Sequence, residues 1–172
     1  MFKIIFSTML LVIFSQSTYA NIKAVFIEGA PKDKFVLSNT SECDLHNIDL
    51  TIDLSESVGA LVFDTKAMGK GVEVFQPFEV TKGNIKLTSA DQVDDGATKL
   101  SLNIETIPAN NSVSFTIDVD DTLTKSQSGN IIITGSEIEN ALLTIENKGK
   151  DIASASFNKN SIAVLTMPEC KS

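Results

Sequence analysis

Short runs of alternating apolar and polar residues constrain the fold of this chain more than any other feature. In the run Ile48–Leu54, every second residue is isoleucine or leucine, with aspartate or threonine between them. The run Val113–Val119 alternates in the same way. Because successive side chains of a strand point to opposite faces of a sheet, this period of two predicts strands with one buried face.

Similar strand signals return roughly every eight to twelve residues, and turn residues bound nearly all of them. No segment shows a helical period. The pattern predicts an all-β chain, an antiparallel β-sandwich of the immunoglobulin-like kind, with a jelly roll or a barrel as the alternatives. The expected strands are Ile22–Ile27, Phe35–Ser38, Ile48–Leu54, Ala60–Phe63, Val72–Val80, Leu100–Ile104, Val113–Val119, Ile131–Thr134, Ala141–Glu146, Ile152–Phe157 and Ile162–Thr166.

Residues 1–20 have the features of a secretory signal peptide. Lys3 precedes the apolar run Ile4–Phe14, and small residues lead to a cleavage site expected after Ala20. The alternative is a membrane anchor, but the apolar run is shorter than the ~20 residues that a spanning helix needs. We therefore expect residues 21–172 to form a single exported domain with no membrane span after cleavage. Its location would be the cell surface, the medium or the periplasm.

The charge and aromatic content argue against several kinds of ligand. The chain has 22 acidic residues against 14 Lys and Arg residues, a net charge of −8, and contains no arginine. Nucleic acid and anionic membranes are poor partners for such a chain, since both bind basic clusters. Tryptophan is absent and the single tyrosine, Tyr19, lies in the signal segment. The usual aromatic platforms for sugars and single strands are therefore missing.

Cys43 and Cys170 are the only cysteines of the chain. In an exported protein an even number of cysteines favours pairing, so we expect a disulfide between them. The alternative is two separate thiols. The bond would connect the C-terminal tail to the turn that contains Cys43.

The turn Pro108–Asn111 is expected to join Leu100–Ile104 and Val113–Val119 as a β-hairpin. In the register that centres this turn, Lys99 lies opposite Asp120. The hairpin would then bring the acidic residues that flank its two strands to one end of the sandwich.

Six aspartates near this end form two groups and are the candidate metal ligands. Calcium binds six to eight oxygen atoms, and loops at the end of a sandwich can supply carboxylates and carbonyls together. Asp44 or Asp64 would join them only if their loops reach the same end. The alternative is that these acids are simply solvated turn residues. The six are Asp118, Asp120 and Asp121 in one group, and Asp91, Asp94 and Asp95 in the other.

Catalytic motifs are scarce. His46 is the sole histidine, no GxSxG motif is present, and a zinc site would need more nitrogen or thiolate ligands. We expect His46 to be an exposed turn residue. A carboxylate pair within the two aspartate groups keeps a hydrolase as a minor alternative, and we predict that the chain is not an enzyme.

Three segments resemble the small exported bacterial proteins of the aggregation factor core family. They are FIEGAPKDKFVLSN (Phe26–Asn39), GVEVFQPFEV (Gly71–Val80) and FTIDVDDTL (Phe115–Leu123). The family label borrows from an extracellular, calcium-dependent adhesion complex of sponges. The resemblance implies adhesion or surface association, through self-association or a cell-surface protein, and it carries no catalytic motif.

Taken together, these features predict a secreted, non-enzymatic β-sandwich that acts in adhesion, aggregation or extracellular assembly, assisted by calcium at its acidic end. The alternative is a periplasmic subunit that binds a partner chain by adding a strand to an exposed sheet edge. Val72–Val80 is the candidate edge, because Pro77 cannot donate a hydrogen bond within a sheet.

Overall fold

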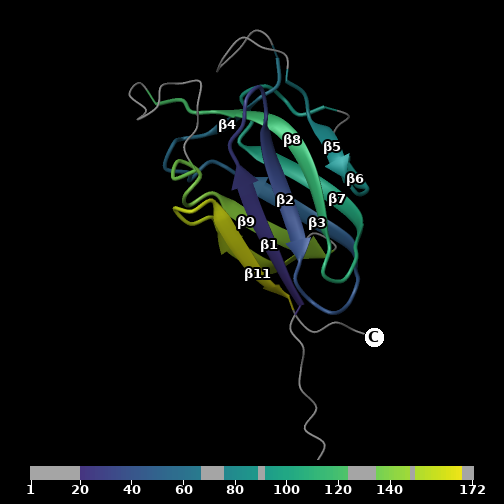
Figure 1. Cartoon of the computed structure of the whole chain (residues 1–172). Helices are drawn as coiled ribbons and strands as arrows, with labels where there is room; N and C mark the ends of the chain where they lie inside the picture. Colours follow the sequence, from purple (N-terminus) through teal and green to yellow (C-terminus); the bar gives the residue numbers. More distant parts are fainter. Residues whose placement is uncertain (1–19, 67–75, 89–91, 124–134, 148–149, 168–172) are drawn as a thin grey trace, which may run out of the picture.

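Two antiparallel sheets packed face to face form the computed structural model, which describes residues 20–66, 76–88, 92–123, 135–147 and 150–167 (Figure 1). These residues contain no helix. The strands are β1 (Ala20–Ile27), β2 (Asp33–Asn39), β3 (Leu45–Asp53), β4 (Val62–Asp64), β5 (Glu79–Lys82), β6 (Ile85–Leu87), β7 (Lys99–Ile107), β8 (Ser112–Asp120), β9 (Leu142–Asn147), β10 (Lys150–Ser156) and β11 (Ile162–Met167). The prediction of an antiparallel β-sandwich is confirmed, and its immunoglobulin-like subtype stays a prediction.

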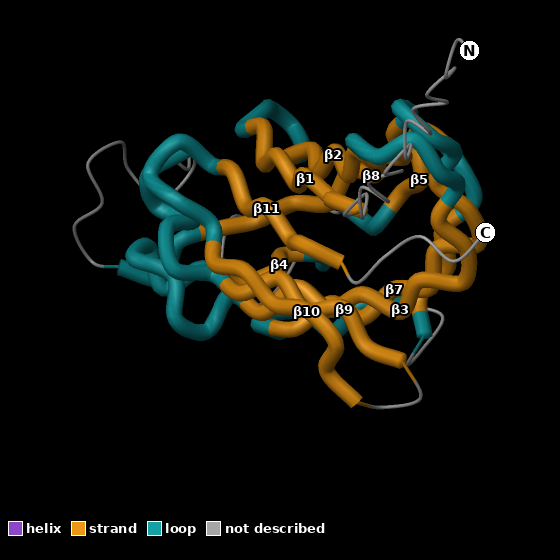
Figure 2. The backbone as a smooth tube through the Cα atoms, turned by 90° about the horizontal axis from the view of Figure 1, so that it is seen from below, coloured by secondary structure: helices purple, strands orange, loops and turns teal. Residues whose placement is uncertain are grey.

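Each sheet has a simple order, and Figure 2 shows the two as separate layers. The first sheet runs β11-β1-β2-β8, and both β4 and β5 pair with the far side of β8. The β5 strand covers the first half of β8, at Ser114–Thr116, whereas β4 covers the last three residues, Asp118–Asp120. The second sheet runs β10-β9-β3-β7-β6.

The core lies between the sheets and is filled by the alternate apolar residues that the sequence pattern singled out. In β3, Ile52 is completely buried, as are Leu102 in β7 and Ile117 in β8. The rings of Phe35 and Phe115 stack with their centroids 5.1 Å apart. Burial of each such side chain contributes about 1.5 to 3 kcal/mol, so the alternation stabilises the fold as well as directing it.

The predicted hairpin of β7 and β8 is wrong, because the two strands lie in different sheets. The β7 strand pairs with β3 and β6, whereas β8 pairs with β2, β4 and β5. The turn that connects β7 to β8 is hydrogen-bonded to the end of β2 and to the residues just after it. The side-chain amide of Asn39 donates to the carbonyls of Ile107 and Pro108 at 3.0 and 3.2 Å, and the amide of Asn110 donates to the carbonyl of Ser41 at 3.1 Å. These contacts direct the chain from one sheet to the other.

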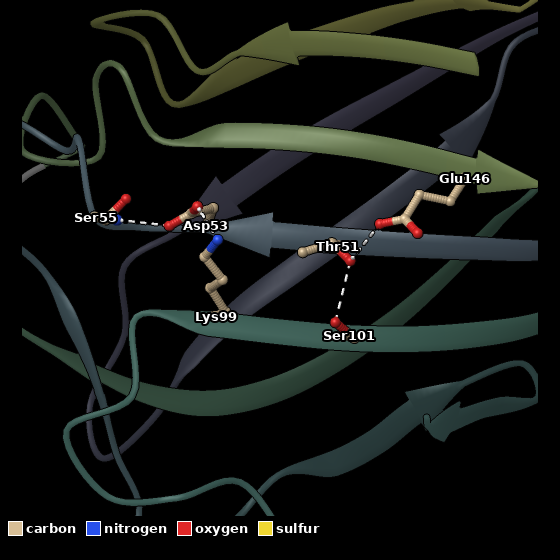
Figure 3. Close-up of polar contacts among 6 residues, drawn as sticks. All are labelled: Thr51, Asp53, Ser55, Lys99, Ser101 and Glu146. Atoms are coloured by element: carbon tan, nitrogen blue, oxygen red, sulfur yellow. Dashed lines mark hydrogen bonds and ion pairs between the residues drawn. The ribbon is translucent and has the colours of Figure 1, made fainter. Parts of the chain in front are cut away.

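The register of Lys99 is corrected in the same way. Lys99 lies opposite Asp53 of β3, and the two side chains form an ion pair of 3.1 Å (Figure 3). Two residues along the same strands, the hydroxyls of Thr51 and Ser101 are 3.1 Å apart. Lys99 therefore belongs to the outer face of the second sheet and does not face Asp120.

Two further elements differ from the strands predicted from the sequence. The strand expected at Val72–Val80 begins only at Glu79, and residues 76–78 approach it as irregular chain; residues 72–75 lie outside the described residues. The short strand β6 was not predicted. The strand expected at Ile131–Thr134 lies outside the described part of the chain.

Two more predictions concern the ends of the chain. Of the predicted signal peptide, residues 1–20, only Ala20 lies within the described residues, so the signal peptide stays a prediction. Cys170 also lies outside the described residues, and none of the cysteines within them is free. The disulfide between Cys43 and Cys170 stays a prediction. Within the described ranges, no helix is long and apolar enough to cross a membrane.

A carboxylate cluster as the candidate functional site

Carboxylates from neighbouring strands meet where β4 pairs with the end of β8. In this register Asp64 lies directly opposite Asp118, and Val62 lies opposite Asp120. Phe63 and Val119, between them, point into the core and are 0% and 2% exposed. The three aspartates therefore share the outer face of the first sheet, where carboxylates opposite one another destabilise a strand pair.

A third segment, residues 92–97, brings Asp95 to the same place. One carboxylate oxygen of Asp95 accepts hydrogen bonds from the backbone amides of Thr65 and Lys66, at 3.0 and 3.1 Å. The segment is also held to β4 by backbone bonds: the amide of Gly96 donates to the carbonyl of Phe63, and the amide of Phe63 donates to the carbonyl of Ala97. Asp95 is thus positioned beside Asp64 by the backbone.

Asp64 is the centre of the cluster. It is 1% exposed, and neither of its carboxylate oxygens receives a hydrogen bond from a donor. It interacts with the carboxyl groups of Asp95 and Asp120. Burial and the contacts with Asp95 and Asp120 raise the pKa of Asp64 to about 8. Three ionised carboxylates cannot bond to one another, so a proton must be shared as long as nothing else supplies positive charge.

The proton belongs mainly to Asp64. Burial opposes ionisation of Asp95, but the amides of Thr65 and Lys66 and the contact with Asp64 together hold the pKa of Asp95 below its ordinary value. Asp95 is therefore the ionised member of this pair. The two groups behave as a coupled acid and base rather than as independent carboxylates.

Two more carboxylates lie close to this cluster. Asp33, at the start of β2, accepts from the amides of Gly29 and Val119 at 3.0 Å each and is 4% exposed. Burial, with smaller contributions from Asp118 and Asp120, raises its pKa to about 7 despite these two bonds. Burial and the charge of Asp120 raise the pKa of the half-buried Asp118 to about 6. Lys32 partly offsets the negative charge near Asp118, and Lys66 that near Asp95, but among the described residues carboxyl groups predominate around the cluster.

The structure brings together three of the six aspartates that the sequence singled out. Asp118, Asp120 and Asp95 lie around Asp64, whereas Asp94 is exposed in the preceding turn. Asp121 is 2% exposed; one of its oxygens accepts from the amide of Leu123 and the other receives no hydrogen bond. Asp91 lies outside the described residues.

The remaining candidates lie elsewhere. Asp44 bonds to the amide of Ala109 at 2.8 Å, beside the turn between β7 and β8, and so does not join the cluster. His46 is exposed, as predicted, but it lies in β3 rather than in a turn, and its Nδ1 is 3.0 Å from the hydroxyl of Thr106.

Sequence reasoning left Asp64 open and missed Asp33. Asp64 follows the apolar run Leu61–Phe63, and an acid directly after buried strand residues was the available signal. Nothing in the sequence showed that β4 would pair with β8 rather than with another strand. Asp33 lies just before the predicted strand Phe35–Ser38, and its environment depends on the distant amide of Val119, to which it is hydrogen-bonded.

The cluster offers only oxygen ligands, which suit a hard cation such as calcium or magnesium. Within the described ranges, no three His, Cys, Asp or Glu side chains are already arranged around a common metal position. Binding of an ion would therefore require the carboxylates to rotate. Comparison with known proteins found no match to the chain among family models, curated proteins or solved structures.

Proposed function

We propose that this chain is an exported, non-enzymatic β-sandwich that acts in adhesion or extracellular assembly, and that the carboxylate cluster is its binding end. The signal-like first residues, the β-sandwich and the resemblance to the aggregation factor core family support this proposal. The carboxylate cluster is a further support, because folding alone does not require buried carboxyl groups to lie together.

The buried carboxylate of Asp64 carries the proposal. A buried polar group without a hydrogen-bond partner costs about 1 to 3 kcal/mol, and more if it is charged. Asp64 adds to this cost by lying opposite Asp118 and against Asp95 and Asp120. Without a ligand the cluster is stable only while Asp64 keeps a proton, and sites that oppose stability in this way are usually functional.

Burial also argues against the hydrolase alternative. A catalytic acid or base has to reach the substrate directly or through one water molecule. Asp64 and Asp120 are only 1% and 2% exposed, so a polymeric or sugar substrate has no direct access to either carboxyl group. The pair suits a small ion better than a scissile bond.

An association assay tests the proposed function. Beads coated with the protein, residues 21–172, are mixed in buffer with 2 mM calcium or with chelator, and clustering is followed by light scattering. The double variant Asp64→Asn/Asp120→Asn should cluster far less than the wild type. The matched control Glu42→Gln/Glu56→Gln also replaces two carboxyl groups by amides, but at exposed positions, and should cluster normally. Equal clustering of the two variants contradicts the proposal.

A second candidate function is partner binding by strand addition, and the β11 edge favours it. The β11 strand lies at the end of the first sheet, carries no charged residue, and leaves Val164 52% exposed. Edge strands of monomeric proteins usually carry lysine, proline or a bulge that prevents pairing. An extended segment of a partner protein would pair here through its backbone. Val164→Lys should then weaken co-purification of one defined partner, whereas Val164→Thr should preserve it.

A further inference from the structure

We propose that Asp64, Asp95 and Asp120 together bind one calcium ion, which fastens residues 92–97 onto the edge strand β4. The inference names the ligand of the binding end and therefore rests on the proposed function. It is carried by the geometry around Asp64.

The carboxyl group of Asp64 lacks a hydrogen-bond donor. Both of its oxygens are buried without a hydrogen-bond donor among the described residues, and the side chains that interact with them, Asp95 and Asp120, are carboxyl groups, which can share a proton but bring no positive charge. A cation between the three groups would give both oxygens a partner and would neutralise most of the negative charge. No rearrangement of the backbone is needed to bring the groups together, since the β4–β8 pairing and the bonds of Asp95 already do so.

The backbone holds one of the two carboxylate oxygens of Asp95 in place. Its Oδ1 accepts from the amides of Thr65 and Lys66, which fixes the carboxylate plane. Oδ2 takes no part in these two bonds and can bind an ion. In metal sites, hydrogen bonds of this kind orient the ligand and raise its affinity. A rotation of the Asp64 and Asp120 side chains completes the set.

The ligand atoms of the cluster favour calcium over other metals. Transition metals prefer nitrogen and sulfur, but His46 lies in β3 beside Thr106, and Cys43 is not a free thiol. Magnesium holds several water molecules in an octahedral shell, which suits an exposed site. Asp64 and Asp120 are almost fully buried, and calcium tolerates irregular sets of six to eight oxygens. Backbone carbonyls and a few water molecules would supply the remaining ligands.

Calcium binding would connect three segments of the chain. The three ligands come from β4, from residues 92–97 and from β8, so a single ion connects segments that are far apart in the sequence. The β4 strand has only three residues and lies at the edge of the sheet, where strands open most readily. Calcium would hold this edge closed and fix the shape of the binding end.

Thermal unfolding of the protein, residues 21–172, with and without calcium tests the inference. At about a hundredfold excess over Kd, calcium should raise the Tm of the wild type by about 5 to 10 °C. Asp64→Asn should abolish this shift, and the same concentration of magnesium should produce a much smaller one. The exposed control Glu42→Gln should respond like the wild type. An unchanged Tm in millimolar calcium, or an equal shift in Asp64→Asn, overturns the inference.

Amide hydrogen exchange distinguishes a local calcium site from a general effect of salt, because it measures the exchange rates of individual amides. Calcium should slow exchange of the Thr65 and Lys66 amides, which bond to Asp95, and should leave the β3–β9 pairing unchanged. Uniform slowing over both regions contradicts a local site. Calcium binding without bead clustering would refute the proposed function alone, and clustering that depends on Asp64 and Asp120 without calcium binding would refute the calcium site alone.

Discussion

Asp64 is the residue at which the requirements of folding and of binding oppose each other most clearly. Asparagine has nearly the same shape as aspartate, is neutral, and carries two donors that can bond to Asp95 and Asp120. Asp64→Asn should therefore raise the metal-free Tm, by about 2 to 4 °C for a gain of about 1 kcal/mol. Differential scanning calorimetry in chelator measures this shift. A lower Tm for the variant would show that the Asp64 carboxyl group stabilises the ligand-free fold, which contradicts a role in ligand binding at the expense of stability.

Asn39 is the residue that contributes most to the crossing between the sheets. Its side-chain amide donates to the carbonyls of Cys43, Ile107 and Pro108, and the residue is 1% exposed. Asn39→Ala leaves buried carbonyls without a donor and should cost about 2 to 3 kcal/mol of unfolding free energy in urea. Thr40→Ala, which removes one exposed hydroxyl beside it, should change the stability by less than about 1 kcal/mol. Similar losses in the two variants would contradict this role for Asn39.

At the level of elements, the alternation of β3, β7 and β8 was enough to predict the strands and their buried faces. It was not enough to predict their partners. Two strands alternate in the same way whether they pair as a hairpin or lie in opposite sheets. The choice depends on the bonds of Asn39 and Asn110, which join residues far apart in the sequence. The acid groups do converge, but through β4 and not through the predicted hairpin.

The turn between β5 and β6 allows a test of a packed element that the sequence did not predict. Gly83 has a φ of +86°, and a Cβ atom there would lie 2.4 Å from Cγ1 of Val113. Gly83→Ala combines an unfavourable backbone conformation with a clash in the core, so we expect a loss of at least about 2 kcal/mol. Lys86→Ala, at an exposed position of β6, should be nearly neutral. Urea unfolding that finds Gly83→Ala as stable as Lys86→Ala would contradict the described turn.

At the level of the whole molecule, the raised pKa values predict an unusual dependence of stability on pH. Asp118, Asp33 and Asp64 have pKa values of about 6, 7 and 8 in the folded protein, against an ordinary value of 3.8. Between about pH 4 and pH 8 the folded state therefore binds more protons than the unfolded chain, and the unfolding free energy falls as the pH rises. In chelator, the Tm at pH 8 should be at least about 3 °C below that at pH 5. A Tm that is constant or rises over this range would contradict the buried acidic cluster.

The predicted disulfide also concerns the whole molecule, because it would close a loop around nearly the entire domain. On the chain-entropy model such a bond contributes up to about 4 to 5 kcal/mol. Non-reducing mass spectrometry should find Cys43 linked to Cys170, and a reductant should lower the Tm. The double variant Cys43→Ser/Cys170→Ser should unfold at the same lower temperature with and without reductant. Free thiols in the oxidised protein would contradict the prediction.

The global features of this molecule were easier to predict than its site. Strand content and the buried faces follow from local alternation, whereas the cluster depends on which edge β4 joins and on how residues 92–97 pack over it. Asp95 and Asp120 were identified because acids were concentrated around them, but Asp64 stands alone in the sequence and becomes central only through pairing with β8.

A crystal structure of the protein grown in calcium tests the central claim most directly, through the anomalous difference density at the end of β4. We predict one ion within about 2.3 to 2.6 Å of oxygens from Asp64, Asp95 and Asp120. Carboxyl groups in direct contact with one another, with no ion between them in crystals grown at millimolar calcium, would contradict the account.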